Sequence, residues 1–120
     1  MNLTKASRIA AAMGLLAVVL GAFGAHGLKD LLGRNGTTII WEKAVFYHFL
    51  HAVMLFVLAE RKIFPAVPWW SFFVGILVFS GSLYILALTN LNWLGAITPI
   101  GGVSFIVGWT CLILHPKKET

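Results

Sequence analysis

The sequence predicts an all-α membrane protein, an antiparallel bundle of four transmembrane helices that forms one domain over residues 1–120. The composition is the first observation. Apolar residues make up 59% of the chain and charged residues 11%, against about 45–50% and about 25% in soluble domains. The second observation is the length of the uncharged stretches, because about 20 helical residues cross a hydrocarbon core of about 30 Å. So few charges cannot give a chain of 120 residues a polar surface, and we expect lipid to surround it.

The first predicted span covers about residues 9–28, which contain no Asp, Glu, Lys or Arg. Lys5 and Arg8 precede this stretch, and four of the five residues at positions 21–25 are glycine or alanine, so a cleaved secretory signal is the alternative interpretation. We favour a span because the apolar run is longer than the usual signal core of about 7–15 residues. The second predicted span covers about residues 41–60.

The third and fourth spans are predicted from one uncharged stretch at residues 63–116. Pro65 and Pro68 disfavour a helix before position 69, so we place the third span at about 69–89. Two asparagines after it favour a turn, and the fourth span follows at about 94–114. The weaker spans have an alternative interpretation, in which they re-enter the same membrane face.

The distribution of Lys and Arg predicts the orientation of the bundle. With four spans, both termini and the second loop share one side of the membrane. This side carries six of these residues: Lys5, Arg8, Arg61, Lys62, Lys117 and Lys118. The other side carries three: Lys29, Arg34 and Lys43. Since cytoplasmic loops carry the excess of Lys and Arg, we expect both termini to be cytoplasmic. Four tryptophans fall at predicted span ends, where indoles favour the membrane interface: Trp41, Trp69, Trp70 and Trp93.

Small residues in the spans predict close helix packing. Ten of the twelve glycines lie within the four predicted spans. The first span carries a stripe of small residues at spacings of three and four: Ala10, Gly14, Ala17, Gly21 and Ala25. Small residues let helix backbones approach closely in lipid. The stripe fits either packing within one chain or the seam of a homo-oligomer, and the sequence leaves both open.

Polar side chains of all four predicted spans lie at a similar depth, about 3–15 Å from the outer end at about 1.5 Å per residue. The candidate residues of this cluster are His26, Tyr47, His48, His51, Ser80, Ser82, Tyr84, Thr98 and Ser104. Ionisable groups within a membrane are costly and tend to be functional. We therefore expect an inward-facing polar cluster in the outer half of the bilayer, which either orders the bundle or holds a small ligand or lipid head group.

Other chemistries have weaker support in the sequence. Imidazole is a common metal ligand, so His26 and His51 are the candidates for a metal or haem site, although no cofactor is identified. The motifs of phosphate, dinucleotide, zinc-protease and serine-hydrolase sites are absent from the sequence, so no catalytic residue is assigned. Cys111 is expected to be an inert core thiol. The basic residues form no stripe with interleaved aromatics, so no nucleic-acid partner is expected.

Four motifs in order resemble a known family: GAFGAH at 21–26, WEKA at 41–44, FSGSLY at 79–84 and TPIGG at 98–102. Together with Tyr47, His51, Phe105, Gly108 and Trp109, they are similar to the small bacterial integral membrane proteins of domain-of-unknown-function family 423. The resemblance implies a four-span protein of the bacterial cytoplasmic membrane and implies no reaction. The family pattern does not include His48, which weakens a metal site built from three histidines.

The sequence therefore predicts a membrane protein that is more consistent with an accessory or ligand-binding role than with an enzyme. A metal- or haem-dependent membrane redox protein is one alternative. A small transporter or channel subunit is the other, and the apolar inner half of the predicted bundle argues against it.

Overall fold

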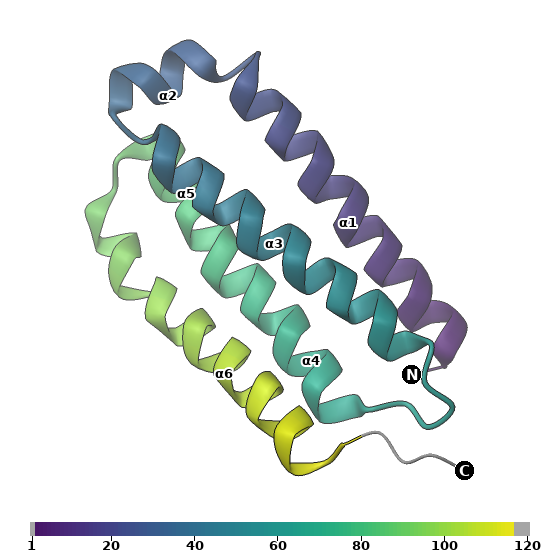
Figure 1. Cartoon of the computed structure of the whole chain (residues 1–120). Helices are drawn as coiled ribbons and strands as arrows, with labels where there is room; N and C mark the ends of the chain where they lie inside the picture. The colour runs from purple at the N-terminus through teal and green to yellow at the C-terminus, as the bar shows by residue number, and fades with distance from the viewer. Residues whose placement is uncertain (1, 117–120) are drawn as a thin grey trace.

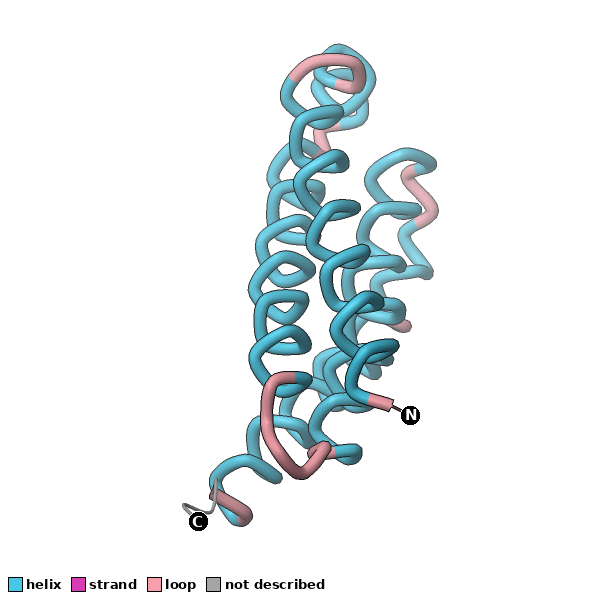
Figure 2. The backbone as a smooth tube through the Cα atoms, turned by 90° about the vertical axis from the view of Figure 1, so that its right-hand side faces the viewer, coloured by secondary structure: helices cyan, strands magenta, loops and turns pink. Residues whose placement is uncertain are grey.

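The computed structural model describes residues 2–116, which form helices joined by short loops, with no strand within that range (Figure 2). The elements in chain order are α1 (Leu3–Ala25), α2 (Lys29–Asn35), α3 (Thr38–Ala59), α4 (Ala66–Gly75), the π-helix η1 (Ile76–Ser80), α5 (Gly81–Thr89), the 3-10 helix η2 (Asn92–Ala96) and α6 (Thr98–Leu114). Four helical segments are long and apolar enough to cross a membrane: Leu3–Ala25, Thr38–Ala59, Ala66–Thr89 and Asn92–Leu114. The four predicted spans are thus matched by four such helices.

All four spanning helices begin before the predicted starts, at residues 3, 38, 66 and 92. α1 begins at Leu3, where the side chain of Asn2 accepts a hydrogen bond from the backbone amide of Lys5 at 2.8 Å. Cations near a helix end can extend their charged groups to the interface, so Lys5 does not prevent helix there. α4 begins at Ala66 because Pro68 lies in its first turn, where the missing amide hydrogen costs no helical hydrogen bond.

The four spanning segments alternate in direction, as Figure 1 shows, and pack as neighbours in an order set by the chain. α1 packs against α3, α3 packs against α4, η1 and α5, and α6 packs against α4 and η1. The contact between α6 and η1 is very close, because Gly101 lies directly against the backbone of Phe79. The short helix α2, which was not predicted, connects α1 to α3 at one end of the bundle.

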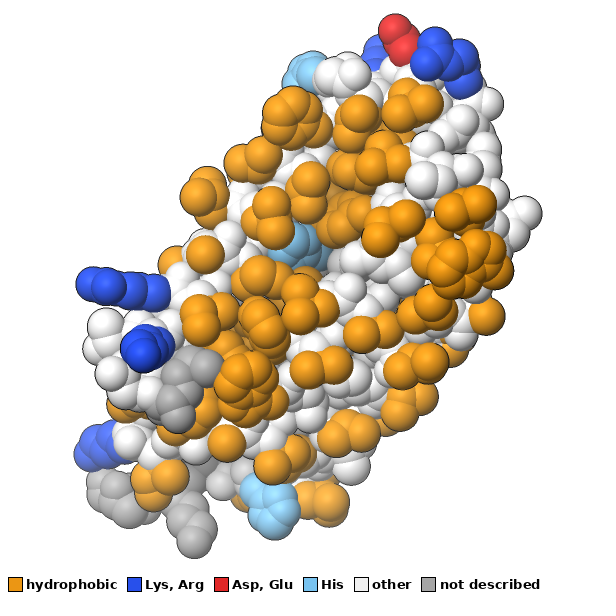
Figure 3. All heavy atoms as spheres, turned by 180° about the vertical axis from the view of Figure 1, so that it is seen from behind, with side chains coloured by type: hydrophobic (Ala, Val, Ile, Leu, Met, Phe, Trp, Pro, Cys, Tyr) orange, Lys and Arg blue, Asp and Glu red, His pale blue; other side chains and the backbone are white. Residues whose placement is uncertain are grey.

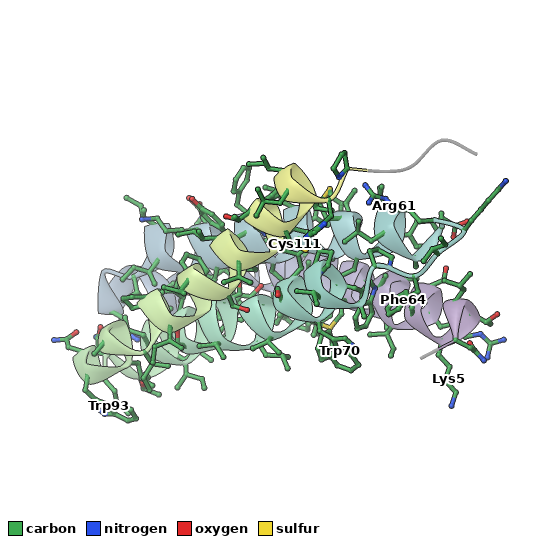
Figure 4. The ribbon with its side chains drawn as sticks, turned by 90° about the horizontal axis from the view of Figure 1, so that it is seen from below. Lys5, Arg61, Phe64, Trp70, Trp93 and Cys111 are labelled. Atoms are coloured by element: carbon green, nitrogen blue, oxygen red, sulfur yellow. The ribbon has the colours of Figure 1, made fainter. Side chains whose placement is uncertain are left out.

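The surface of the bundle is apolar in the middle and charged at the ends (Figure 3). Lys5 and Arg61 lie at one end of the long axis and Trp93 at the other (Figure 4). Lys5 and Arg61 are two of the six basic residues assigned to the cytoplasmic side, and they lie at the same end of the bundle. Lys117 and Lys118, also assigned to that side, lie outside the described residues. The distribution fits a membrane protein, because charged groups are stable only outside the hydrocarbon core.

The tryptophans at the span ends do not all lie at the interface. Trp70 and Trp93 are exposed, as predicted, but Trp41 and Trp69 are buried within the protein. The indole of Trp41 occupies the space beside Gly24, where any side chain would collide with it. Its Nε1–H donates a hydrogen bond to the Leu20 carbonyl of α1 at 2.9 Å. Trp41 therefore joins α1 to α3 instead of marking the lipid–water boundary.

Candidate functional site

The first pair of interior polar side chains joins α3 to α5. His48 is buried, and its Nδ1 lies 2.8 Å from the hydroxyl of Tyr84. The Nε2 atom of His48 is buried and has no hydrogen-bond partner among the described residues. The ring of Tyr84 packs against that of Trp41 at a centroid distance of 4.8 Å. This pair therefore sits where α1, α3 and α5 come together.

His51 forms a second link, from α3 to α6, and uses both of its ring nitrogens. Its Nδ1–H donates to the Tyr47 carbonyl at 2.8 Å, and its Nε2 accepts from the Nε1–H of Trp109 at 3.1 Å. Since a carbonyl only accepts and an indole only donates, the proton of His51 must be on Nδ1. The ring also stacks on Phe105, with centroids 3.7 Å apart and planes at 10°. His51 has no free lone pair for a metal ion in this arrangement.

The hydroxyl groups connect neighbouring helices in the same way. Ser80 donates to the Ala44 carbonyl of α3 at 2.8 Å, and Ser104 of α6 donates to the Ser71 carbonyl of α4 at 2.6 Å. The hydroxyls of Ser82 and Thr98 lie 2.6 Å apart. Polar side chains hydrogen-bond across helices in membranes because lipid offers them no partner. These residues therefore link neighbouring helices in pairs.

The side chains of two predicted residues, His26 and Tyr47, make no hydrogen bond in these links, although the Tyr47 carbonyl accepts one from His51. His26 is exposed at the C-terminal end of α1, so the structure does not bring it to His51. Tyr47 is about one-third exposed, and its ring packs against Phe79 at 4.8 Å. Within residues 2–116, no group of three or more His, Cys, Asp and Glu side chains could hold a metal ion. Cys111 is a half-buried free thiol.

Besides Trp41, three residues outside the predicted cluster make polar links between helices: Asn35, Thr37 and Trp109. Trp109 lies in the last two turns of α6, and its place in the family motif was the available signal. Asn35 and Thr37 both donate to the Ala87 carbonyl, at 3.0 and 2.7 Å. The last carbonyls of a helix have no partner within it, so these two residues satisfy the end of α5.

A groove of about 760 Å³ lies on the surface of the bundle between α1 and α3. Its volume is in the range of small-molecule sites, about 300–1,000 Å³. The walls are lined by residues of three helices: Ala17, Val18, Gly21, Ala22, Gly24 and Ala25 of α1, Lys29 and Leu32 of α2, and Thr38, Trp41, Glu42, Val45, Phe46, Phe49, Leu50 and Val53 of α3. The groove is thus apolar along most of its length and polar at the α2 end.

The groove exists because the side chains of one wall are small. Its α1 wall is built mainly from alanine and glycine, whereas α3 contributes large residues such as Phe46, Phe49 and Leu50. This explains part of the predicted stripe of small residues. Ala10 is buried against the rest of the protein, whereas Ala17, Gly21 and Ala25 line the groove.

The fold and the interior links define an integral membrane protein with four candidate spans, held together by hydrogen bonds between helices. Residues 20–102 match the family described as "Protein of unknown function (DUF423)". The chain belongs to this family, as its four motifs predicted. No solved structure matches the chain.

The relatives are membrane proteins of similar length. A UPF0382 membrane protein of Staphylococcus epidermidis is 50% identical over 108 residues, which cover 87% of this chain and 88% of the relative. The UPF0382 membrane protein YwdK of Bacillus subtilis is 46% identical over 110 residues, which cover 87% of this chain and 89% of the relative. The names of these relatives state a membrane location and no reaction.

Proposed function

We propose that this chain is a non-enzymatic membrane protein that binds a lipid in the groove between α1 and α3. The observation that carries the proposal is the groove itself, because it is apolar along α3 and ends among Lys29, Thr38 and Glu42. A molecule that fits such a site has a long apolar body and a polar end, and membrane lipids have both.

The two alternatives from the sequence find less support in the geometry. A metal or haem centre at His26 and His51 would need both imidazoles, but His51 uses both of its nitrogens and His26 lies apart at a helix end. Nε2 of His48 is free, but within residues 2–116 it belongs to no group of three or more His, Cys, Asp and Glu side chains that could hold a metal ion. A transporter or channel would need interior polar groups along a path. Ser80 and Ser104 instead donate to backbone carbonyls of neighbouring helices. Lipid binding uses a surface that these links leave open.

Filling the groove is expected to release the lipid. In the Ala22→Phe protein, a phenyl ring replaces a methyl group in the α1 wall and occupies the space of an acyl chain. We expect the lipid that co-purifies in mild detergent to fall at least fivefold, measured by native mass spectrometry. A fivefold loss corresponds to about 1 kcal/mol, which is close to the free energy of exposing one buried methylene group, about 0.8 kcal/mol.

The matched control is Ala12→Phe, the same change at an exposed position of α1 that does not line the groove. This variant is expected to retain lipid as the wild type does. Equal retention by both variants would overturn the proposal. A change of oligomeric state in Ala22→Phe with no loss of lipid would show that the groove binds a second copy of the chain instead.

We also propose that both termini face the cytoplasm of a bacterial cell, in its cytoplasmic membrane. Support comes from the excess of Lys and Arg on that side, as the positive-inside rule requires. A green fluorescent protein fused to the C-terminus is expected to fluoresce, and alkaline phosphatase fused there is expected to be inactive. The reverse pair of results would invert the orientation.

A further inference from the structure

We propose that the groove selects a phospholipid whose headgroup carries both an anionic phosphate and a primary ammonium group. This inference rests on the proposed lipid-binding function and names the class of lipid. Its basis is the polar end of the groove, where Lys29 of α2 and Glu42 of α3 line the same space. One is a cation and the other an anion, and both side chains are exposed.

Each of these two charges fits one part of such a headgroup. The ammonium of Lys29 is a compact donor that binds phosphate oxygens. The carboxylate of Glu42 only accepts hydrogen bonds when ionised, so it pairs with an N–H donor such as a primary ammonium. An anionic headgroup without an amine would leave Glu42 unmatched and bring a second negative charge close to it.

The length of the groove places these charges at the headgroup level. On α3 the lining residues run from Thr38 to Val53, which is about 22 Å at 1.5 Å per residue. One leaflet contributes about half of the 30 Å hydrocarbon core, or about 15 Å. The groove is therefore long enough for the acyl chains of one leaflet with a headgroup at the α2 end.

The apolar character of the α3 side chains along the groove agrees with a headgroup at the α2 end. Below Glu42 the α3 wall is formed by Val45, Phe46, Phe49 and Leu50, which offer no hydrogen bond to a headgroup. The polar groups of a bound lipid can therefore be satisfied only at the α2 end. This fixes the direction of the lipid, with its phosphate near Lys29 and its acyl chains toward Val53.

The test is a competition between phosphatidylethanolamine and phosphatidylglycerol in mixed micelles, with the retained lipid measured by native mass spectrometry. Wild-type protein is expected to retain phosphatidylethanolamine about fivefold better, the scale of one exposed ion pair. Glu42→Gln is expected to abolish this preference. Lys29→Gln is expected to reduce retention of both lipids about threefold to fivefold, because both carry a phosphate.

The matched controls are Asp30→Asn and Lys43→Gln, which make the same changes of charge at residues outside the groove lining. Both are expected to leave retention and preference unchanged. Equal retention of the two lipids by wild type, or the same loss of preference in Asp30→Asn, would overturn the inference. If wild type shows no preference but Ala22→Phe still releases lipid, only the headgroup assignment fails. If Ala22→Phe retains lipid as wild type does, both the headgroup assignment and the proposed lipid binding fail.

Discussion

Replacing Gly101 by alanine is expected to lower the free energy of unfolding by about 3 kcal/mol, the upper part of the range for overpacking a tight contact. A methyl group at this position would collide with the backbone nitrogen and Cα of Phe79 in η1. Backbone atoms within a helix cannot move aside as the end of a flexible side chain can. We therefore expect α6 to be pushed away from η1, with a lower midpoint of thermal unfolding in detergent.

The adjacent glycine provides the matched control. A methyl group at Gly102 would lie in ordinary contact with the Phe79 ring, 3.9 Å from its Cδ2. Since alanine also favours helix over glycine by about 1 kcal/mol, Gly102→Ala is expected to be neutral or slightly stabilising. Equal unfolding temperatures for the two variants would contradict the close packing of α6 on η1.

Replacing His51 by leucine is expected to lower the free energy of unfolding by about 2 kcal/mol, the usual cost of leaving a buried polar group without a partner. The change removes the acceptor of the Trp109 indole and the donor to the Tyr47 carbonyl. Stacking on Phe105 is lost as well. Denaturant unfolding followed by circular dichroism measures the effect.

Two further variants distinguish the loss of the hydrogen bond between His51 and Trp109 from a general loss of packing. Cys111→Ala removes a half-buried thiol and is expected to change the unfolding free energy by less than about 0.5 kcal/mol. Trp109→Phe removes the donor, so it should cost much less in the His51→Leu background than in wild type, as expected for interacting residues. Additive costs, or equal tolerance of His51→Leu and Cys111→Ala, would show that His51 does not join α3 to α6.

The spans could be predicted from the sequence because hydropathy and charge act over about 20 residues at a time. Their ends were harder to place, since they depend on single residues. Asn2 extends α1 toward the N-terminus, and Pro68 is accepted in the first turn of α4. The helix α2 was missed because seven residues between two spans carry little periodic signal.

The site could be predicted only in part. Inward-facing polar residues at a shared depth follow from helix geometry, and His48, His51, Ser80 and Ser82 are indeed buried. Which residues hydrogen-bond to each other depends on the rotation of each helix about its axis. Hydropathy and residue spacing do not give this rotation. The groove depends on the same rotation, because it forms where the small side chains of α1 face large residues of α3.

The most direct measurement is the mapping of crosslinks from a phospholipid that carries a photoreactive group in its acyl chain. The protein is reconstituted with trace amounts of this lipid, irradiated and digested, and the modified residues are identified by mass spectrometry. We expect the crosslinks to concentrate on residues 17–25 and 45–53, which form the walls of the groove. An even spread over the exposed apolar residues of α4, α5 and α6 would contradict a bound lipid between α1 and α3.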